Sequence, residues 1–190
     1  MNEALGLTPS QTVGPYLHIG LLRELIVPQL VDPADPRAIR IRGQLLDGAG
    51  DPVPDGMVEI WQANAAGRYA HPADSREDVP LEDGFGGFGR SGTVAEGRFE
   101  FVTVKPGSVP WPAGGMQAPH IDVGVFSRGL LKRVATRIYF PDEVEANAGD
   151  PVLSGLDPDA RATLIAVPDG DALRFDIRLQ GEGQTTFFAL

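Results

Sequence analysis

Residues 38–63, which read AIRIRGQLLDGAGDPVPDGMVEIWQA, decide the fold class. In AIRIRGQLL (38–46) and MVEIWQA (57–63), apolar residues alternate with polar ones. That period of two is typical of a strand with one buried face. The ten residues between them, DGAGDPVPDG (47–56), are dense in the residue types that form turns. The stretch therefore predicts strand, turn, strand.

The same pattern recurs along the chain. Further strands are predicted at 98–104, 120–127, 131–140, 161–168 and 172–180, the last two joined by a hairpin signal at 169–171. Only short helical segments are expected, within 17–26 and 141–149. The 24 Gly and 17 Pro also favour many turns over long helices. Many short strands without long helices predict an all-β protein, an antiparallel β-sandwich.

The expected organisation is a single domain, 1–190, with an extended N-terminal arm (1–37), a C-terminal tail (181–190) and a long Gly-rich loop (64–98). Such a long loop inside a compact domain usually serves binding or function. The arm and the tail carry aromatic residues, Tyr16, Phe187 and Phe188. These aromatics pack either against another chain or back onto the chain's own sandwich, and the sequence leaves both alternatives open.

Composition excludes several functions. The net charge of −10 argues against partners that are nucleic acids or anionic membranes. No run of eighteen apolar residues is present, so no membrane span is expected. With no cysteine, the chain has no disulfide, thiolate metal site or Fe–S cluster. The start, MNEALGLTPSQT, does not resemble a secretory signal, so we expect a cytoplasmic protein.

Residue types alone give little chemistry. The sequence contains no G-x-S-x-G turn, no phosphate-binding glycine loop and no H-E-x-x-H, and GFGGFGR (84–90) is expected to be a turn-rich loop with buried aromatics. On a strand, His120 and Asp122 would point to the same face and could provide two metal ligands. The alternative, which we favour from the residues alone, is that His120 caps a strand end while Asp122 pairs with Lys132 or Arg133.

Six motifs occur in an order that spans the chain from residue 8 almost to its end: TPSQTVGPYLHIGL (8–21), WQANAAGRYAH (61–71), GFGGFGR (84–90), VKPGSVPW (104–111), PHIDVGVFSRG (119–129) and RFDIRLQGEGQTTFF (174–188). Together they resemble the intradiol ring-cleavage dioxygenases. The resemblance implies a non-haem Fe(III), held by two Tyr and two His, that activates a catechol for attack by O2. The ring is then cut between its two hydroxyl-bearing carbons. For protocatechuate, the product is a carboxymuconate.

The resemblance also identifies the four positions where the family holds iron, which are Tyr69, Val109, His120 and Asp122 in this chain. Val109 stands where the family has a second Tyr, and Asp122 stands where it has a second His. Two of four ligands are therefore changed, and valine has no donor atom. The resemblance thus implies an alpha-type subunit without a metal or cofactor of its own. The Fe(III) would belong to a beta-type partner subunit in a hetero-oligomer.

Alpha-type subunits of the family help to close the partner's substrate pocket. The matching residues are Gly14, Pro15, Tyr16 and Arg128. A Gly-Pro backbone can approach a planar ring, a tyrosine offers a hydroxyl group, and an arginine offers a planar fork to a carboxylate. Arg133 and Arg137 are expected to be solvated or paired structural residues.

Two other functions are compatible with parts of the sequence. One is a self-sufficient dioxygenase with a rearranged metal site. The other is a non-enzymatic, transthyretin-like binding module, which residues 41–61 also resemble, although that module explains neither the GPY motif nor the QGEG motif.

Overall fold

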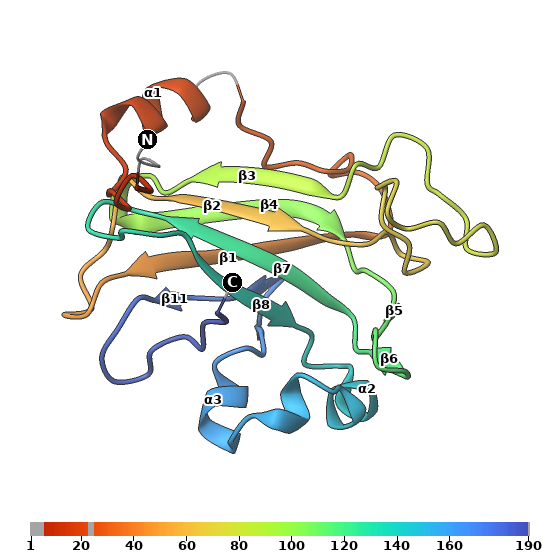
Figure 1. Cartoon of the computed structure of the whole chain (residues 1–190). Helices are drawn as coiled ribbons and strands as arrows, with labels where there is room; N and C mark the ends of the chain where they lie inside the picture. The colour runs from red at the N-terminus through yellow and green to blue at the C-terminus, as the bar shows by residue number, and fades with distance from the viewer. Residues whose placement is uncertain (1–5, 23–24, 190) are drawn as a thin grey trace, which may run out of the picture.

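A computed structural model describes residues 6–22 and 25–189, so parts of the predicted arm (1–5 and 23–24) and the last residue of the tail (190) lie outside the described residues. Two β-sheets face each other (Figure 1). One sheet has four antiparallel strands in the order β3-β2-β7-β8. Its strands are β2 (Met57–Trp61), β3 (Phe88–Gly92), β7 (His120–Phe126) and β8 (Val134–Tyr139).

The second sheet is built around β1. Its strands are β1 (Ala38–Leu46), β4 (Arg98–Val104), β9 (Val167–Asp169), β10 (Ala172–Arg174) and β11 (Ile177–Arg178). β4 pairs with β1 in antiparallel fashion, but β10 and β11 both run parallel to β1. The predicted β-sandwich is confirmed, and the difference from the prediction is that this second sheet is mixed. The predicted strand 172–180 is also interrupted, because the Asp176 side chain accepts a bond from Gln44 N at 3.1 Å in place of a ladder bond.

The core lies between the two sheets. Alternate residues of β1 and β4 are buried against alternate residues of β2 and β7, as the period of two predicted. Phe101 at the centre of β4 is 0 % exposed. The main cluster is Ile41, Leu45, Val58, Ile60, Phe99, Phe101, Ile121, Val123, Val125, Ile138, Phe140, Ala166, Phe175 and Ile177.

Short helices lie outside the sandwich. They are α1 (Pro15–Leu21), α2 (Val144–Gly149) and α3 (Pro158–Ala162), with 3-10 turns at Ala95–Gly97 and Leu153–Gly155. α1 lies beyond β3, whereas α2 and α3 lie on the opposite side, below β8 in the view of Figure 1. No described helix combines the length and the apolar character needed to cross a membrane.

The predicted strand at 161–168 is wrong up to residue 166. Asp157 caps α3 by accepting a hydrogen bond from Ala160 N at 2.8 Å, and Pro158 occupies the first turn of the helix. Leu164 and Ala166 are buried because the segment that follows the helix packs beneath β8, where Tyr139 N donates to Leu164 O at 2.9 Å. Alternating burial therefore arose here without a strand.

The Gly-rich segment is shorter than predicted, because β3 begins at Phe88 inside it. The remaining loop projects from the end of the sandwich at the right of Figure 1. In GFGGFGR, Phe85 is buried as expected, whereas the expectation was wrong for Phe88, which is exposed at the edge of the sheet.

The two chain ends behave differently. Phe188 N donates to Ala135 O at 2.8 Å, and Phe187 and Phe188 pack against the chain's own core clusters. The tail therefore folds back on the sandwich. The N-terminal segment forms isolated bridges with the sheets at Val27 and Gln29, and upstream of them Tyr16 remains 83 % exposed.

Candidate functional site

The four ligand positions (Tyr69, Val109, His120 and Asp122) converge at one end of the sandwich, where β7 begins. Two short strands, β5 (Val109–Pro110) and β6 (Met116–Gln117), bring Val109 opposite Gln117 just before β7. Tyr69 comes from the long loop, and its ring stacks on Trp61 with the centroids 5.9 Å apart. Trp61 lines both a cavity of about 460 Å³ that includes Tyr69 and Val109 and one of about 650 Å³ that includes Asp122.

The Asp122 carboxylate is occupied by an arginine. Arg137 stands directly opposite Asp122 in the β7–β8 register, and its Nε donates to Asp122 Oδ1 at 2.9 Å. Pairing of Asp122 with a basic neighbour is thus confirmed, but the predicted partners, Lys132 and Arg133, were wrong. They lie before the paired part of β8, and Arg133 extends over Gly124 instead.

His120 is buried and only half satisfied. Its Nδ1 donates to the Ala118 carbonyl at 2.7 Å, which leaves Nε2 as a lone pair. Nε2 has no hydrogen-bond partner among the described residues and lies 4.0 Å from Asp122 Oδ2. Burial, together with the positive charge of Arg137, lowers the pKa of His120, so the imidazole is neutral.

Tyr69 is a protonated phenol. Burial and the nearby Asp122 carboxylate raise its pKa to about 12, although Arg137 acts in the opposite direction. A ferric ligand must be a phenolate, and such a ligand loses its proton when a metal binds. Val109, at the remaining ligand position, is buried and offers only methyl groups.

These residues do not fit Fe(III). One position has no donor atom, one carboxylate is already paired with a guanidinium, and that guanidinium is close enough to act on the remaining imidazole and phenol. Throughout residues 6–22 and 25–189, no three His, Asp or Glu side chains are grouped so that they could hold a metal ion.

The residues predicted to contact substrate lie at the opposite end of β7. Arg128 lies two residues beyond the end of β7, so it is separated from His120 by at least the length of the strand, about 20 Å. Its side chain is 71 % exposed, and its Nε pairs with the Asp55 carboxylate. Asp55 lies in the turn before β2. The sequence predicts that turn but gives no signal that Asp55 contacts Arg128.

The N-terminal arm reaches the same place. Gly129 N donates to Thr12 Oγ1 at 2.8 Å, which ties the arm to the turn that carries Arg128. Two residues later the arm exposes Gly14, and Pro15 and Tyr16 then begin α1. The structure thus brings the arm to the Arg128 turn through Thr12, a residue in the same motif that the sequence prediction did not single out.

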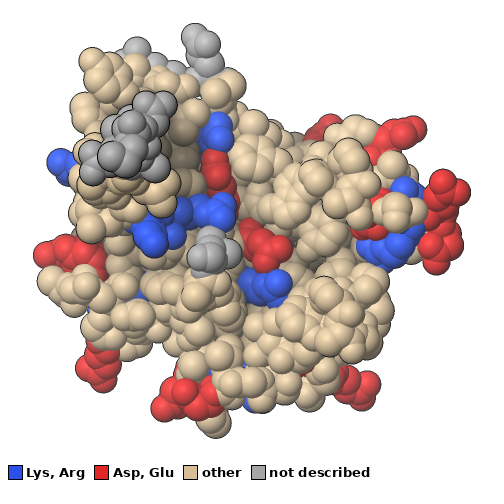
Figure 2. All heavy atoms as spheres, viewed as in Figure 1, with Lys and Arg blue, Asp and Glu red and all other residues tan. Residues whose placement is uncertain are grey.

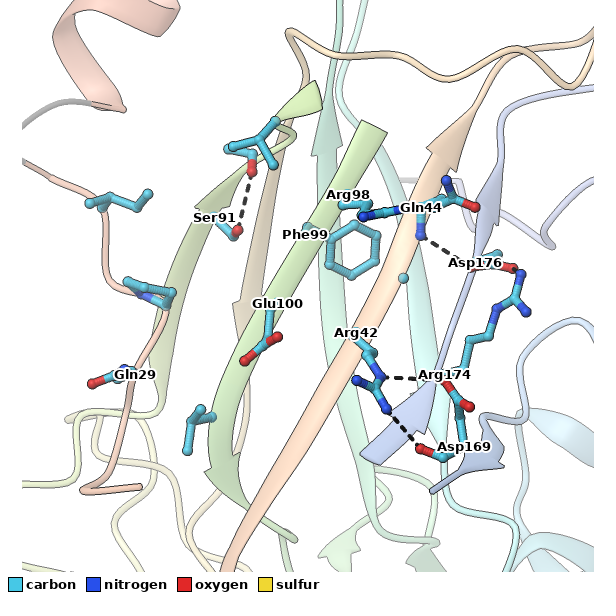
Figure 3. Close-up of a pocket in the computed structure, with 16 residues that line it drawn as sticks. Gln29, Arg42, Gln44, Ser91, Arg98, Phe99, Glu100, Asp169, Arg174 and Asp176 are labelled. Carbon is cyan, nitrogen blue, oxygen red and sulfur yellow. Dashed lines mark hydrogen bonds and ion pairs between the residues drawn. The ribbon is translucent and has the colours of Figure 1, made fainter. Parts of the chain in front are cut away.

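A larger cavity lies elsewhere. It measures about 910 Å³ and lies over the outer face of β1 and β4 (Figure 3). Its arginines are already paired: Arg42 lies 3.3 Å from Asp169, and Arg174 pairs with Asp176 at 2.5 Å. These pairs leave the cavity with little net charge to attract a ligand. The size of the cavity alone does not indicate a function. Figure 2 shows the same mixing of acidic and basic groups on another face of the molecule.

Comparison with known proteins decides the family. A family model described as "Dioxygenase" matches residues 26–181. The alpha chain of protocatechuate 3,4-dioxygenase from Pseudomonas putida is 44 % identical over 98 % of both chains. The corresponding alpha chain from Burkholderia cepacia is 45 % identical over 95 % of this chain and 96 % of its own length.

The chain belongs to the intradiol dioxygenase family.

Similarity to another intradiol dioxygenase chain is less extensive. The beta chain of protocatechuate 3,4-dioxygenase from Burkholderia cepacia is 40 % identical, over 81 % of this chain and 68 % of its own length. Among solved structures, the dioxygenase domain of a carbohydrate-binding fusion protein from Streptomyces sp. SirexAA-E superposes with a TM-score of 0.59 at 24 % identity, covering 82 % of this chain and 88 % of that one. This likeness shows a shared fold.

Proposed function

We propose that the chain is the alpha subunit of a protocatechuate 3,4-dioxygenase. With a beta subunit, it would cleave protocatechuate between the two hydroxylated carbons, using O2, to give 3-carboxy-cis,cis-muconate. The observation that carries the proposal is the similarity to two alpha chains, at 44–45 % identity over nearly their whole length. The beta chain matches over a smaller share of both chains.

In this proposal the chain carries no cofactor, and the beta subunit holds the Fe(III). The state of the four ligand positions supports this division, because Val109 has no donor and Asp122 is paired with Arg137. The iron of the partner would bind the catechol oxygens and make the ring reactive to O2. The same state of the site argues against a self-sufficient dioxygenase.

The contribution of this chain would be to close the partner's pocket. Arg128 is exposed and lies at the far end of β7 from the four ligand positions. Its neighbour Gly129 donates a backbone hydrogen bond to Thr12 of the arm. A fork-shaped guanidinium there can hold the carboxylate of protocatechuate. Gly14 and Pro15 would let the backbone approach the ring, and Tyr16 would add a hydroxyl and a ring face.

Asp55 gives this site a further property. It pairs with Arg128, so a substrate carboxylate that binds Arg128 would compete with it. Its negative charge also repels a second carboxylate. We therefore assign Asp55 the role of a competitor that weakens binding of the substrate at Arg128.

The remaining partners follow from charge and family. An excess of 26 acidic over 16 basic residues does not favour nucleic acid or an anionic membrane surface. The proposed partners are the beta subunit, protocatechuate and O2, and the proposed location is the cytoplasm. A transthyretin-like binding module is not favoured, because the similarity extends across the whole chain rather than over residues 41–61 alone.

The experiment is co-expression of this chain with a beta chain of the family. The purified pair is expected to consume O2 and open the ring of protocatechuate, whereas this chain alone does neither. A matched beta chain expressed alone is the control for residual activity. Ring opening by this chain alone would overturn the proposal, as would a pair whose activity is independent of this chain.

A further inference from the structure

Arg137 contacts one of the four ligand positions directly and a neighbour of a second one. Its guanidinium donates from Nε to Asp122 Oδ1 at 2.9 Å and from Nη1 to Gln117 Oε1 at 2.8 Å. Asp122 is one of the four ligand positions, and Gln117 stands opposite another, Val109. The side chain is only 18 % exposed, so this is a fixed group inside the site rather than a mobile surface arginine.

A third contact of Arg137 is with Tyr139, on the same strand. Nη1 also donates to the Tyr139 hydroxyl at 3.3 Å, and Tyr139 in turn donates to Asp150 Oδ1 at 3.2 Å. Asp150 is fully buried and accepts bonds from three backbone N–H groups, those of Ala118, Val152 and Leu153. The guanidinium is therefore held in place by a network that continues into the core.

The groups around Arg137 are those that would bind a cation. Three groups remain from the family's ligand positions: the Asp122 carboxylate, the phenol of Tyr69 and the Nε2 of buried His120, for which the described part of the chain offers no hydrogen-bond partner. With Arg137 in place, a metal ion would meet a fixed like charge in a half-buried site, where repulsion is only weakly screened. Without Arg137, the carboxylate would lose its partner.

We propose that the Arg137 guanidinium is a built-in substitute for the metal ion and is the group that keeps iron out of this chain. The lack of iron binding then has two causes. Two ligands are missing, and the Arg137 guanidinium neutralises the negative charge of Asp122. Restoring the two missing ligands alone would not restore iron binding. The proposal rests on family membership and not on the proposed function, because its test measures metal binding and not ring opening.

The experiment compares two variants of the full chain. The double variant, Val109→Tyr with Asp122→His, restores the ligand types but retains Arg137. The triple variant adds Arg137→Gln. After incubation with ferric nitrilotriacetate and gel filtration, the triple variant should retain at least about tenfold more iron than the double variant and should show a tyrosinate-to-iron absorption band. The double variant should retain no more iron than the unchanged chain.

A single substitution provides a second test that does not depend on rebuilding the whole site. Arg137→Gln leaves Asp122, His120 and Tyr69 without the guanidinium, so added Zn²⁺ should raise its melting temperature. At a concentration about 100 times the dissociation constant, the rise should be about 5–10 °C. The unchanged chain should not respond. The control is Arg90→Gln, which removes the cation of another half-buried pair, Arg90 with Glu59 at 2.6 Å, on the same sheet.

Two results would overturn the proposal. One is equal iron in the double variant and the folded triple variant. The other is a Zn²⁺ response of Arg137→Gln no greater than that of Arg90→Gln, and this result counts even if the triple variant fails to fold.

Discussion

The substitution Arg128→Ala tests the proposed contact between this chain and the substrate. A hydrogen-bonded pair between arginine and a carboxylate contributes about 1.5–3 kcal/mol. Here Arg128 must first release Asp55, and this pair is largely exposed, at 71 % and 33 % for the two side chains. Exposed pairs are worth about 0–1 kcal/mol. The difference leaves about 0.5–3 kcal/mol, so KM for protocatechuate should rise about 2- to 150-fold.

The assay is steady-state kinetics on the complex of this chain with its beta subunit. Catechol has no carboxylate, so its KM should change much less. Turnover at saturation should fall less than KM rises, because the carboxylate is bound equally in the ground and transition states. Arg128→Lys should recover only part of the loss, since an ammonium cannot reproduce the planar fork. Asp55→Asn should act in the opposite direction and lower KM by up to about fivefold.

Two outcomes would refute this reasoning. Unchanged protocatechuate kinetics for Arg128→Ala, in a complex with normal iron content, would show that the chain has only a structural role and does not bind the substrate through Arg128. An equal loss with catechol and protocatechuate would show that Arg128 acts on the structure of the pocket and not on the carboxylate.

Three further predictions concern the chain itself. Phe101→Ala, at a fully buried position, should lower the free energy of unfolding by about 3–5 kcal/mol in urea titrations, whereas the exposed-edge control Phe88→Ala should cost less than about 1 kcal/mol. Stability should fall as pH drops below 6.5, because burial lowers the pKa of His120 and the unfolded chain then binds the proton first; His120→Gln should flatten that part of the urea profile. The isolated chain should self-associate in sedimentation experiments through exposed apolar residues of its N-terminal segment, such as Leu7 and Tyr16, and the beta subunit should suppress this and raise its melting temperature. A monodisperse monomer that the partner leaves unchanged would contradict the last prediction.

Strands were predictable where burial on one face imposed a period of two. β1, β2, β4 and β7 lie within a residue or two of the predicted ranges, because each has one face against the core. The prediction failed after Asp157, where an irregular segment buries Leu164 and Ala166 by packing beneath β8. The signal for the helix was present in Asp157-Pro158, a capping residue followed by proline, but the apolar residues downstream outweighed it.

The sequence indicates residues for a candidate site but not the contacts that they make. The motifs identified Tyr69, Val109, His120, Asp122 and Arg128, because each lies in a recognisable local pattern. The partners of these residues depend on strand register and on loop approach, which a single sequence does not specify. For this reason the pairing of Asp122 with Arg137 and that of Arg128 with Asp55 appeared only in the structure.

The iron content of the purified chain, measured with and without its partner, shows most directly whether this chain holds a metal of its own. The chain alone should be colourless and nearly free of iron. The two-subunit complex should contain iron in an amount equal to its beta chains, with the tyrosinate-to-iron absorption band. Stoichiometric iron and that absorption band in the isolated chain would be the contradicting result. They would mean that neither the missing donor atom at Val109 nor the pairing of Asp122 with Arg137 prevents this chain from binding iron.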